Sequence, residues 1–177
     1  VTDPASPLRI ELAAPTGNGE LLRKHYAAAP DLKHYFDTVT AHYISINTPE
    51  SMLDILGKYR AIMAEYGDTL KPIVNTEEGT AGPLGTGVAS EFAQIQAFVN
   101  AYVIGASEGI EATMWFHGVM PGNQPLPVAV AANTVVSQIE DAVPIAAPEV
   151  GEGIYDYAFV RGNRRIDVVW TQTEKKT

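Results

Sequence analysis

Four short apolar runs rich in β-branched residues alternate with segments of helical period along the chain. The runs begin near Leu8, Phe36, Ile73 and Ile110, a spacing of roughly 30 to 40 residues that suits one strand and one helix each. Parallel strands need a crossover connection, which is usually a helix, so this order indicates a parallel sheet covered by helices. The sequence therefore predicts an α/β fold of about four βα units.

The limits of these elements follow from turn and cap residues. We expect strands at residues 8–14, 36–44, 73–76 and 110–116, and helices at 20–28, from Pro49 past Met63, from about 90 to 102, and up to Ile139. The second helix has the strongest signal, because Thr48 can cap it, Pro49 suits its first position, and its apolar residues recur every three or four positions.

The hydrophobic period changes to two after the Pro- and Ala-rich connection at residues 144–148. Tyr155, Tyr157 and Phe159 alternate with smaller residues on one side of Gly162-Asn163, and a similar alternation follows. This pattern predicts an antiparallel β-hairpin over residues 155–170. We therefore expect a domain at residues 1–143 and a β extension at 144–177.

Charge and composition exclude several partners. Twelve basic against 21 acidic residues give a net charge of −9, and no run of Lys and Arg could neutralise successive phosphates, so we expect no nucleic acid partner. The chain has no Cys, which excludes disulfides and thiolate metal sites. No apolar stretch approaches the roughly 20 residues of a membrane span.

Polar and aromatic residues stand where three of the predicted strands end. The second strand ends in His42-Tyr43, the third in Asn75-Thr76-Glu77-Glu78, and the fourth in Trp115-Phe116-His117. Loops after the strands of a parallel βα barrel form its active face. The sequence thus predicts that an imidazole, a phenol, one or two carboxylates and an indole meet at one rim. The four histidines lack metal-ligand spacing, so we expect no metal and no cofactor.

These segments, in this order, resemble the last strands of clan A glycoside hydrolases. Residues 37–43 (DTVTAHY) resemble the sixth strand of that barrel, 71–79 (KPIVNTEEG) the seventh with its Thr-Glu-x-Gly nucleophile site, and 110–115 the Trp-bearing eighth. The hairpin is similar to strands of the small β-sandwich that often follows such barrels. The resemblance implies a partial (β/α)₈ TIM barrel, strands 5 to 8, followed by a short antiparallel hairpin.

The resemblance also implies an activity and a set of roles. It suggests a retaining glycoside hydrolase acting on a poly- or oligosaccharide, with Glu77 as the nucleophile and Tyr43 as its hydrogen-bond partner. Of the substrate-binding positions, His42 would serve a subsite and Trp115 would stack on a sugar, and Asn75 and His117 would complete the set. Chemically, a retaining enzyme needs an ionised carboxylate under the anomeric carbon and a second carboxylic acid roughly 5 to 5.5 Å away.

Other interpretations stay open at this point. Glu77 and Glu78 could be solvated loop carboxylates, His42 a core histidine, and Trp115 part of the barrel packing. At the level of the whole chain, a degenerate barrel that binds carbohydrate or serves as a scaffold has the same pattern, because a fold does not guarantee chemistry. A different parallel α/β enzyme also fits the βα order, but not the Trp-bearing strand and the β tail.

The second carboxylic acid of the mechanism is missing from the sequence. Clan A enzymes carry it as the Glu of an Asn-Glu pair after the fourth strand, and this chain contains no Asn-Glu. We therefore expect a fragment that is inactive alone, with an N-terminal half of the barrel or a partner chain covering the strand edges at 8–14 and 110–116. The lack of Cys and the acidic composition suit an extracellular or periplasmic enzyme.

Overall fold

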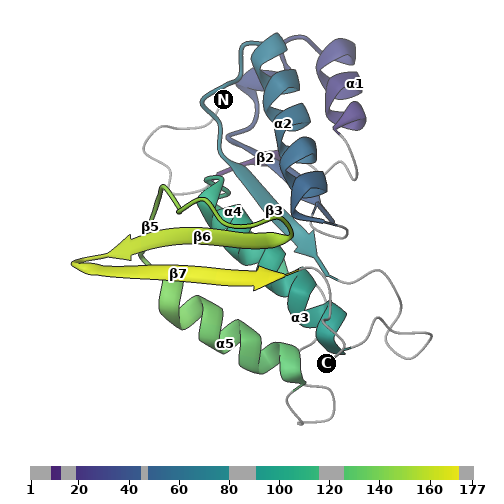
Figure 1. Ribbon diagram of the computed structural model, residues 1–177. Helices are drawn as coiled ribbons and strands as arrows, with labels where there is room; N and C mark the ends of the chain where they lie inside the picture. The colour runs from purple at the N-terminus through teal and green to yellow at the C-terminus, as the bar shows by residue number, and fades with distance from the viewer. Residues whose placement is uncertain (1–8, 13–18, 45–47, 80–90, 116–125, 172–177) are drawn as a thin grey trace. The chain divides into compact units, whose positions relative to one another are not determined.

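The computed structural model describes residues 9–12, 19–44, 48–79, 91–115 and 126–171 (Figure 1). The chain is a mixed α/β protein that divides into two compact units, one formed by Val1–Gly79 with Gly109–Phe116 and the other by Thr80–Glu108 with His117–Thr177. Each unit has its own sheet. The domain boundary that the sequence predicts after residue 143 stays a prediction.

The first unit contains a four-stranded parallel sheet in the order β1-β2-β3-β4. The strands are β1 (Glu11–Leu12), β2 (Thr38–His42), β3 (Ile73–Glu78) and β4 (Ala112–Trp115). The predicted parallel sheet is thus confirmed. Three described strands are shorter than expected, whereas β3 continues two residues further, so that Glu77 and Glu78 belong to the strand itself.

Two helices of the first unit cover this sheet with apolar side chains. They are α1 (Glu20–Ala28) and α2 (Pro49–Glu65), which lie side by side in Figure 1. A short 3₁₀ helix, Leu32–His34, follows α1. As predicted, α2 begins with Pro49, and the Thr48 side chain accepts a hydrogen bond from the Ser51 N–H while Ser51 Oγ accepts one from the Thr48 N–H. This reciprocal cap satisfies two backbone donors that the first turn leaves free.

An ion pair links the two edges of the parallel sheet. Arg9, just before β1, donates hydrogen bonds with both terminal nitrogens to the carboxylate of Glu111, just before β4. Two strands separate β1 from β4, so in a flat sheet these edges would lie about 14 Å apart. Arg and Glu are both long side chains that together reach across most of this distance, so the ion pair joins the two edge strands of the sheet. The Arg9 guanidinium also lowers the pKa of Glu111.

The second unit combines helices with a three-stranded antiparallel sheet. A continuous helical stretch is made of α3 (Glu91–Val99), a π-helical turn (Asn100–Ile104) and α4 (Gly105–Ser107), and α5 (Pro127–Ile139) packs beside α3 (Figure 1). The sheet order is β5-β6-β7, with β5 (Val143–Ile145), β6 (Ile154–Arg161) and β7 (Arg164–Thr171).

The β6–β7 hairpin confirms the predicted change of period. Gly162 lies at the turn with a φ of 62°, in the left-handed region that suits glycine. The third strand, β5, was not predicted, because Pro144 in its middle is typical of a connection. Proline is tolerated there since β5 is an edge strand, and it pairs with Phe159 on one side only.

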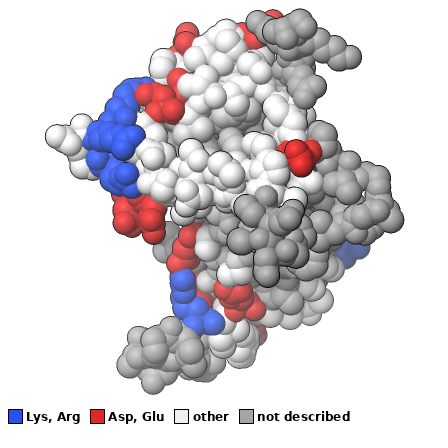
Figure 2. Space-filling model, turned by 90° about the horizontal axis from the view of Figure 1, so that it is seen from below, with Lys and Arg blue, Asp and Glu red and all other residues white. Residues whose placement is uncertain are grey.

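The surface of the described residues carries mixed charges. On the face shown in Figure 2, basic groups lie next to acidic ones. Within the same described ranges, no helix is long and apolar enough to cross a bilayer. The expectation of no nucleic acid partner stays a prediction.

The core of the first unit contains one buried polar contact that can be tested directly. The Tyr26 hydroxyl donates a 2.6 Å hydrogen bond to the Asp68 carboxylate, whose other oxygen pairs with Lys71. Tyr26→Phe should lower the free energy of unfolding by about 1.5 to 3 kcal/mol, because a charged acceptor would lose a buried donor. Urea unfolding measures this. The matched control is Tyr35→Phe, since Tyr35 is 56% exposed; equal stability of the two variants would contradict the assignment.

Candidate active site

Strand β3 contains one residue more than either neighbouring strand can pair with. Ala41 pairs with Asn75, but His42 pairs with Glu77, so β3 advances two residues while β2 advances one. On the other side Asn75 pairs with Thr113 and Glu78 with Trp115, which again leaves one extra residue in β3. This is a β-bulge between Asn75 and Glu77. Bulges redirect side chains, and they are over-represented next to active sites.

The bulge explains why two consecutive residues of β3 contact one histidine. In a regular strand Thr76 and Glu77 would point to opposite faces. Here His42 Nε2 lies 2.9 Å from Thr76 Oγ1, and His42 Nδ1 lies 3.7 Å from Glu77 Oε2. The imidazole thus bridges a hydroxyl and a carboxylate. The contact of Thr76 with His42 was not predicted from the sequence.

Tyr43 binds Glu77 through both its backbone and its side chain. Its N–H donates a 2.8 Å hydrogen bond to the Glu77 carbonyl, and its hydroxyl donates to Glu77 Oε1. The contact that the sequence predicted between these residues is therefore present. Tyr43 has a φ of 52°, which is uncommon for a residue with a side chain and costs of order 1 to 3 kcal/mol. The backbone is held in this conformation where the phenol meets the carboxylate.

The contact with Glu77 changes the pKa of Tyr43. Its hydrogen bond to Glu77, together with desolvation and the negative charge of Glu77 and Glu78, raises the pKa of Tyr43 to about 12. The phenol therefore stays protonated at neutral pH and keeps donating to the carboxylate. The Glu77 side chain is 28% exposed and that of His42 is 22% exposed, so both are partly accessible to a ligand.

Asn75 and Glu78 lie on the buried side of the same strand end. Both are 0% exposed, and the Asn75 Nδ2 donates a 2.7 Å hydrogen bond to Glu78 Oε2. Glu78 Oε1 also accepts a 3.1 Å hydrogen bond from the N–H of Gly79. The pairing of Glu78 with Asn75 was not predicted from the sequence. The substrate-binding role suggested for Asn75 stays a prediction.

The remaining predicted residues are on or after β4. Trp115 ends this strand, is partly exposed, and pairs in register with Glu78. It therefore lies on the strand next to the bulge. His117 lies outside the described residues. The sugar-stacking role of Trp115 and the substrate-binding role of His117 stay predictions.

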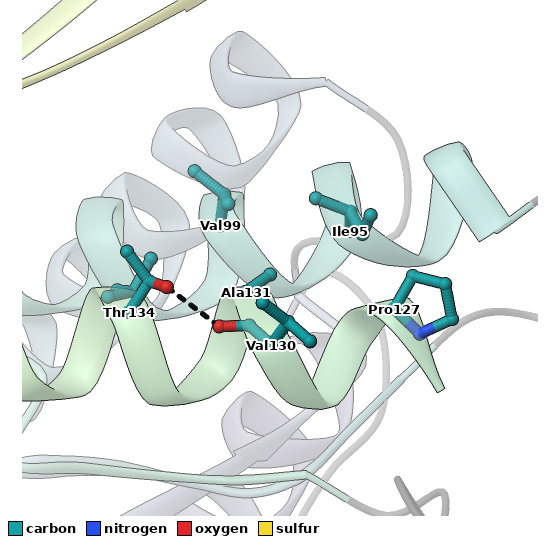
Figure 3. A pocket seen from close by; sticks show the side chains of 7 residues that line it. Ile95, Val99, Pro127, Val130, Ala131 and Thr134 are labelled. Carbon is teal, nitrogen blue, oxygen red and sulfur yellow. Dashed lines mark hydrogen bonds between the residues drawn. The ribbon is translucent and has the colours of Figure 1, made fainter. Parts of the chain in front are cut away.

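A hollow of about 310 Å³ lies elsewhere in the first unit, lined by Arg60, Met63, Thr69, Lys71, Pro72, Ile73 and Gly109. In the described part of the chain, no group of three or more His, Asp or Glu side chains is placed to hold a metal ion. A groove of about 630 Å³ lies between α3 and α5 (Figure 3), lined by Ile95, Val99, Pro127, Val130, Ala131, Thr134 and Val135. The hydroxyl of Thr134 donates to the Val130 carbonyl, so this groove offers no free reactive group from its lining.

The cluster at the end of β3 can do two things chemically. A carboxylate with one oxygen bound by a phenol has a fixed orientation, and its second oxygen lies near an imidazole rather than in a tight ion pair. Such a group can act as a nucleophile or as a base toward a ligand. His42, with a ring nitrogen beside Thr76, can donate or accept a hydrogen bond according to its tautomer.

Comparison with known proteins leaves the family open. No protein-family model matches the chain, and no curated protein matches it. Among solved structures, a glucosidase from Croceicoccus marinus is similar with a TM-score of 0.49 and 13% sequence identity, over 82% of this chain and 42% of that one. The chain thus spans less than half the length of that protein. At this identity and TM-score the likeness assigns neither an activity nor a site.

The contact between Tyr43 and Glu77 has a measurable consequence. At pH 11 a tyrosine with the ordinary pKa near 10 is about nine-tenths ionised, whereas Tyr43 should be about one-tenth ionised. Glu77→Gln removes the charged acceptor and should lower the pKa of Tyr43, so that most of the phenol ionises at pH 11. The measurement is NMR titration of ¹³C-labelled tyrosine rings, with Tyr43→Phe assigning the signal. An unchanged titration in Glu77→Gln would show that the two side chains do not interact.

Proposed function

We propose that this chain forms part of a retaining glycoside hydrolase in which Glu77 is the nucleophile. The observation that carries the proposal is the arrangement around one partly exposed carboxylate: Tyr43 donates to one oxygen of Glu77, and His42 lies beside the other. The residues stand at the carboxyl ends of neighbouring parallel strands, where enzymes of this fold class place their chemistry.

In the proposed reaction, a Glu77 oxygen attacks the anomeric carbon of a poly- or oligosaccharide. The bond from that carbon to the leaving oxygen breaks, its electron pair stays with the oxygen, and an acid supplies a proton to it. Water then attacks the glycosyl ester, giving up a proton to the same group, and releases Glu77 as a carboxylate. Tyr43 keeps Glu77 oriented by donating to one oxygen while the other reacts. His42 and Trp115 would contact the sugar.

Among the described side chains, no second carboxylic acid is placed beside Glu77 to act as the acid of this mechanism. Glu78 is fully buried and is bound to Asn75 and Gly79. We therefore propose that the acid comes from further βα units that complete a barrel, supplied by a longer form of the chain or by a partner chain. The open parallel sheet with two edge strands supports this, because such edges are normally paired or covered.

The nucleophile role predicts a large kinetic effect. In the natural protein that carries these residues, Glu77→Gln should lower kcat on an activated aryl glycoside by well over tenfold, since the covalent intermediate cannot form. The matched control is Glu65→Gln on α2, which removes only an exposed pair with Arg23. A loss of less than about tenfold, or about 1.4 kcal/mol of barrier, would remove Glu77 from this role. Sugar binding without any turnover would instead favour a non-catalytic carbohydrate-binding barrel.

Completion of the barrel gives a second prediction. The 177-residue chain expressed alone should show no turnover of an unactivated oligosaccharide, and it should associate with itself or with a complementary chain in size-exclusion chromatography with light scattering. The edges of β1 and β4 are the surfaces that association would cover. A monodisperse monomer that hydrolyses the oligosaccharide would contradict the need for a second half.

A further inference from the structure

The buried pair next to the proposed nucleophile has a geometry that a regular strand does not allow. Asn75 and Glu78 are three residues apart, so an unbulged strand would send their side chains to opposite faces. Their 2.7 Å hydrogen bond places them on the same side of β3. The extra residue of β3 lies between them and allows both side chains to point to the same side of the strand.

We infer that the hydrogen bond from Asn75 to Glu78 is a positioning device that holds the bulge of β3 and thereby aims the Glu77 carboxylate at the Tyr43 hydroxyl. Asn75 and Glu78 are positioning residues in this account, because they act through Glu77. The inference rests on the proposed function only in naming Glu77 as the reacting group.

The chemistry of the pair supports a specific role. Burying a carboxylate costs several kcal/mol unless hydrogen bonds compensate, and apolar residues of similar size would fill the same space without that cost. Here both Glu78 oxygens accept hydrogen bonds, one from Asn75 and one from the N–H of Gly79, the residue at which β3 has ended. The two bonds therefore fix the backbone on both sides of Glu77.

The orientation of the Asn75 amide follows from the same contact. Reversing the amide would set two acceptor oxygens against each other, so Nδ2 faces the carboxylate. Within the described residues Oδ1 then has no hydrogen-bond partner although it is buried. A buried oxygen without a hydrogen bond costs free energy, so the hydrogen bond to Glu78 is what holds the Asn75 side chain in this orientation.

The device also explains how strain at Tyr43 is sustained. Tyr43 holds its positive φ beside Glu77, where its N–H binds the Glu77 carbonyl. Strained backbone persists only when surrounding contacts over-determine it. If the bulge relaxed, Glu77 would turn with the strand, and both hydrogen bonds of Tyr43 to it would weaken together.

The test uses Tyr43 as the reporter and requires no turnover. Asn75→Ala keeps every charge and removes only the donor, so it should lower the Tyr43 pKa from about 12 to 11 or below. The ionised fraction of Tyr43 at pH 11 would then rise from about one-tenth to at least about half. The titration follows ¹³C-labelled tyrosine by NMR, with circular dichroism confirming a folded chain. Thr38→Ala, which alters a buried polar residue at the other end of β2, should leave Tyr43 unchanged.

A swap of the two groups provides the second arm. Asn75→Asp alone puts two carboxylates together. It should lower the pKa of Tyr43, as Asn75→Ala should. The double variant Asn75→Asp/Glu78→Gln restores one amide and one carboxylate, because Gln can donate to Asp, and it should return Tyr43 to about one-tenth ionised at pH 11. If the single variants fail to fold, the titration of Tyr43 in the double variant still tests the positioning role.

The outcomes separate this inference from the proposed function. A folded Asn75→Ala chain with the wild-type Tyr43 titration, or a folded double variant with Tyr43 mostly ionised at pH 11, would overturn the positioning role. Neither result would bear on whether Glu77 attacks a sugar. Conversely, evidence that the protein is not a glycoside hydrolase would leave the expected titration of Tyr43 unchanged.

Discussion

Between Asn75 and Glu77, strand β3 holds one residue more than β2 and β4 can pair with, and the side chains of the candidate active site lie where this extra residue puts them. A regular strand would separate Thr76 from Glu77 and Asn75 from Glu78. The bulge brings the first two to His42 and the last two to each other. Both the partly exposed cluster and the buried pair therefore depend on one irregularity of register.

The two sides of the strand end have different physical tasks. On the partly exposed side, Glu77 keeps one oxygen bound to a phenol and has the other near an imidazole, an arrangement that orients a carboxylate without neutralising it. On the buried side, Glu78 is enclosed and satisfied by donors. Two adjacent carboxylates in one sequence thus have separate environments, which is the usual way that proteins give similar groups different roles.

Much of the fold could be predicted from the sequence, because periodicity is a local property. The order of strands and helices, the cap at Thr48 and the β6–β7 hairpin all follow from residue spacing and turn chemistry. The strand β5 was missed because Pro144 is a turn signal unless the strand lies at an edge, and edge position depends on the tertiary structure. The membership of the two compact units was not predicted either, since it depends on which helices pack on which sheet.

Several residues of the site could be predicted from the sequence, but their arrangement in space could not. The polar residues that end β2 and β3 identify Tyr43 and Glu77, and their hydrogen bond is present. The bulge cannot be read from the sequence, because it is a mismatch between β3 and two strands that are distant along the chain. Alternation places Asn75 on the same face as Glu77, so the pairing of Asn75 with Glu78 and the contact of Thr76 with His42 had no sequence signal.

A nucleophilic Glu77 must form a covalent bond from its carboxylate to an anomeric carbon, and covalent trapping can detect that bond. Dinitrophenyl 2-deoxy-2-fluoro glycosides of several common sugars carry a leaving group that departs without an acid, so the missing half of the mechanism is not required. Peptide mass spectrometry then locates the label. We expect a glycosyl ester on Glu77 that is absent from the Glu77→Gln variant. Labelling of another residue, or no labelling of the natural protein that carries this chain, would contradict it.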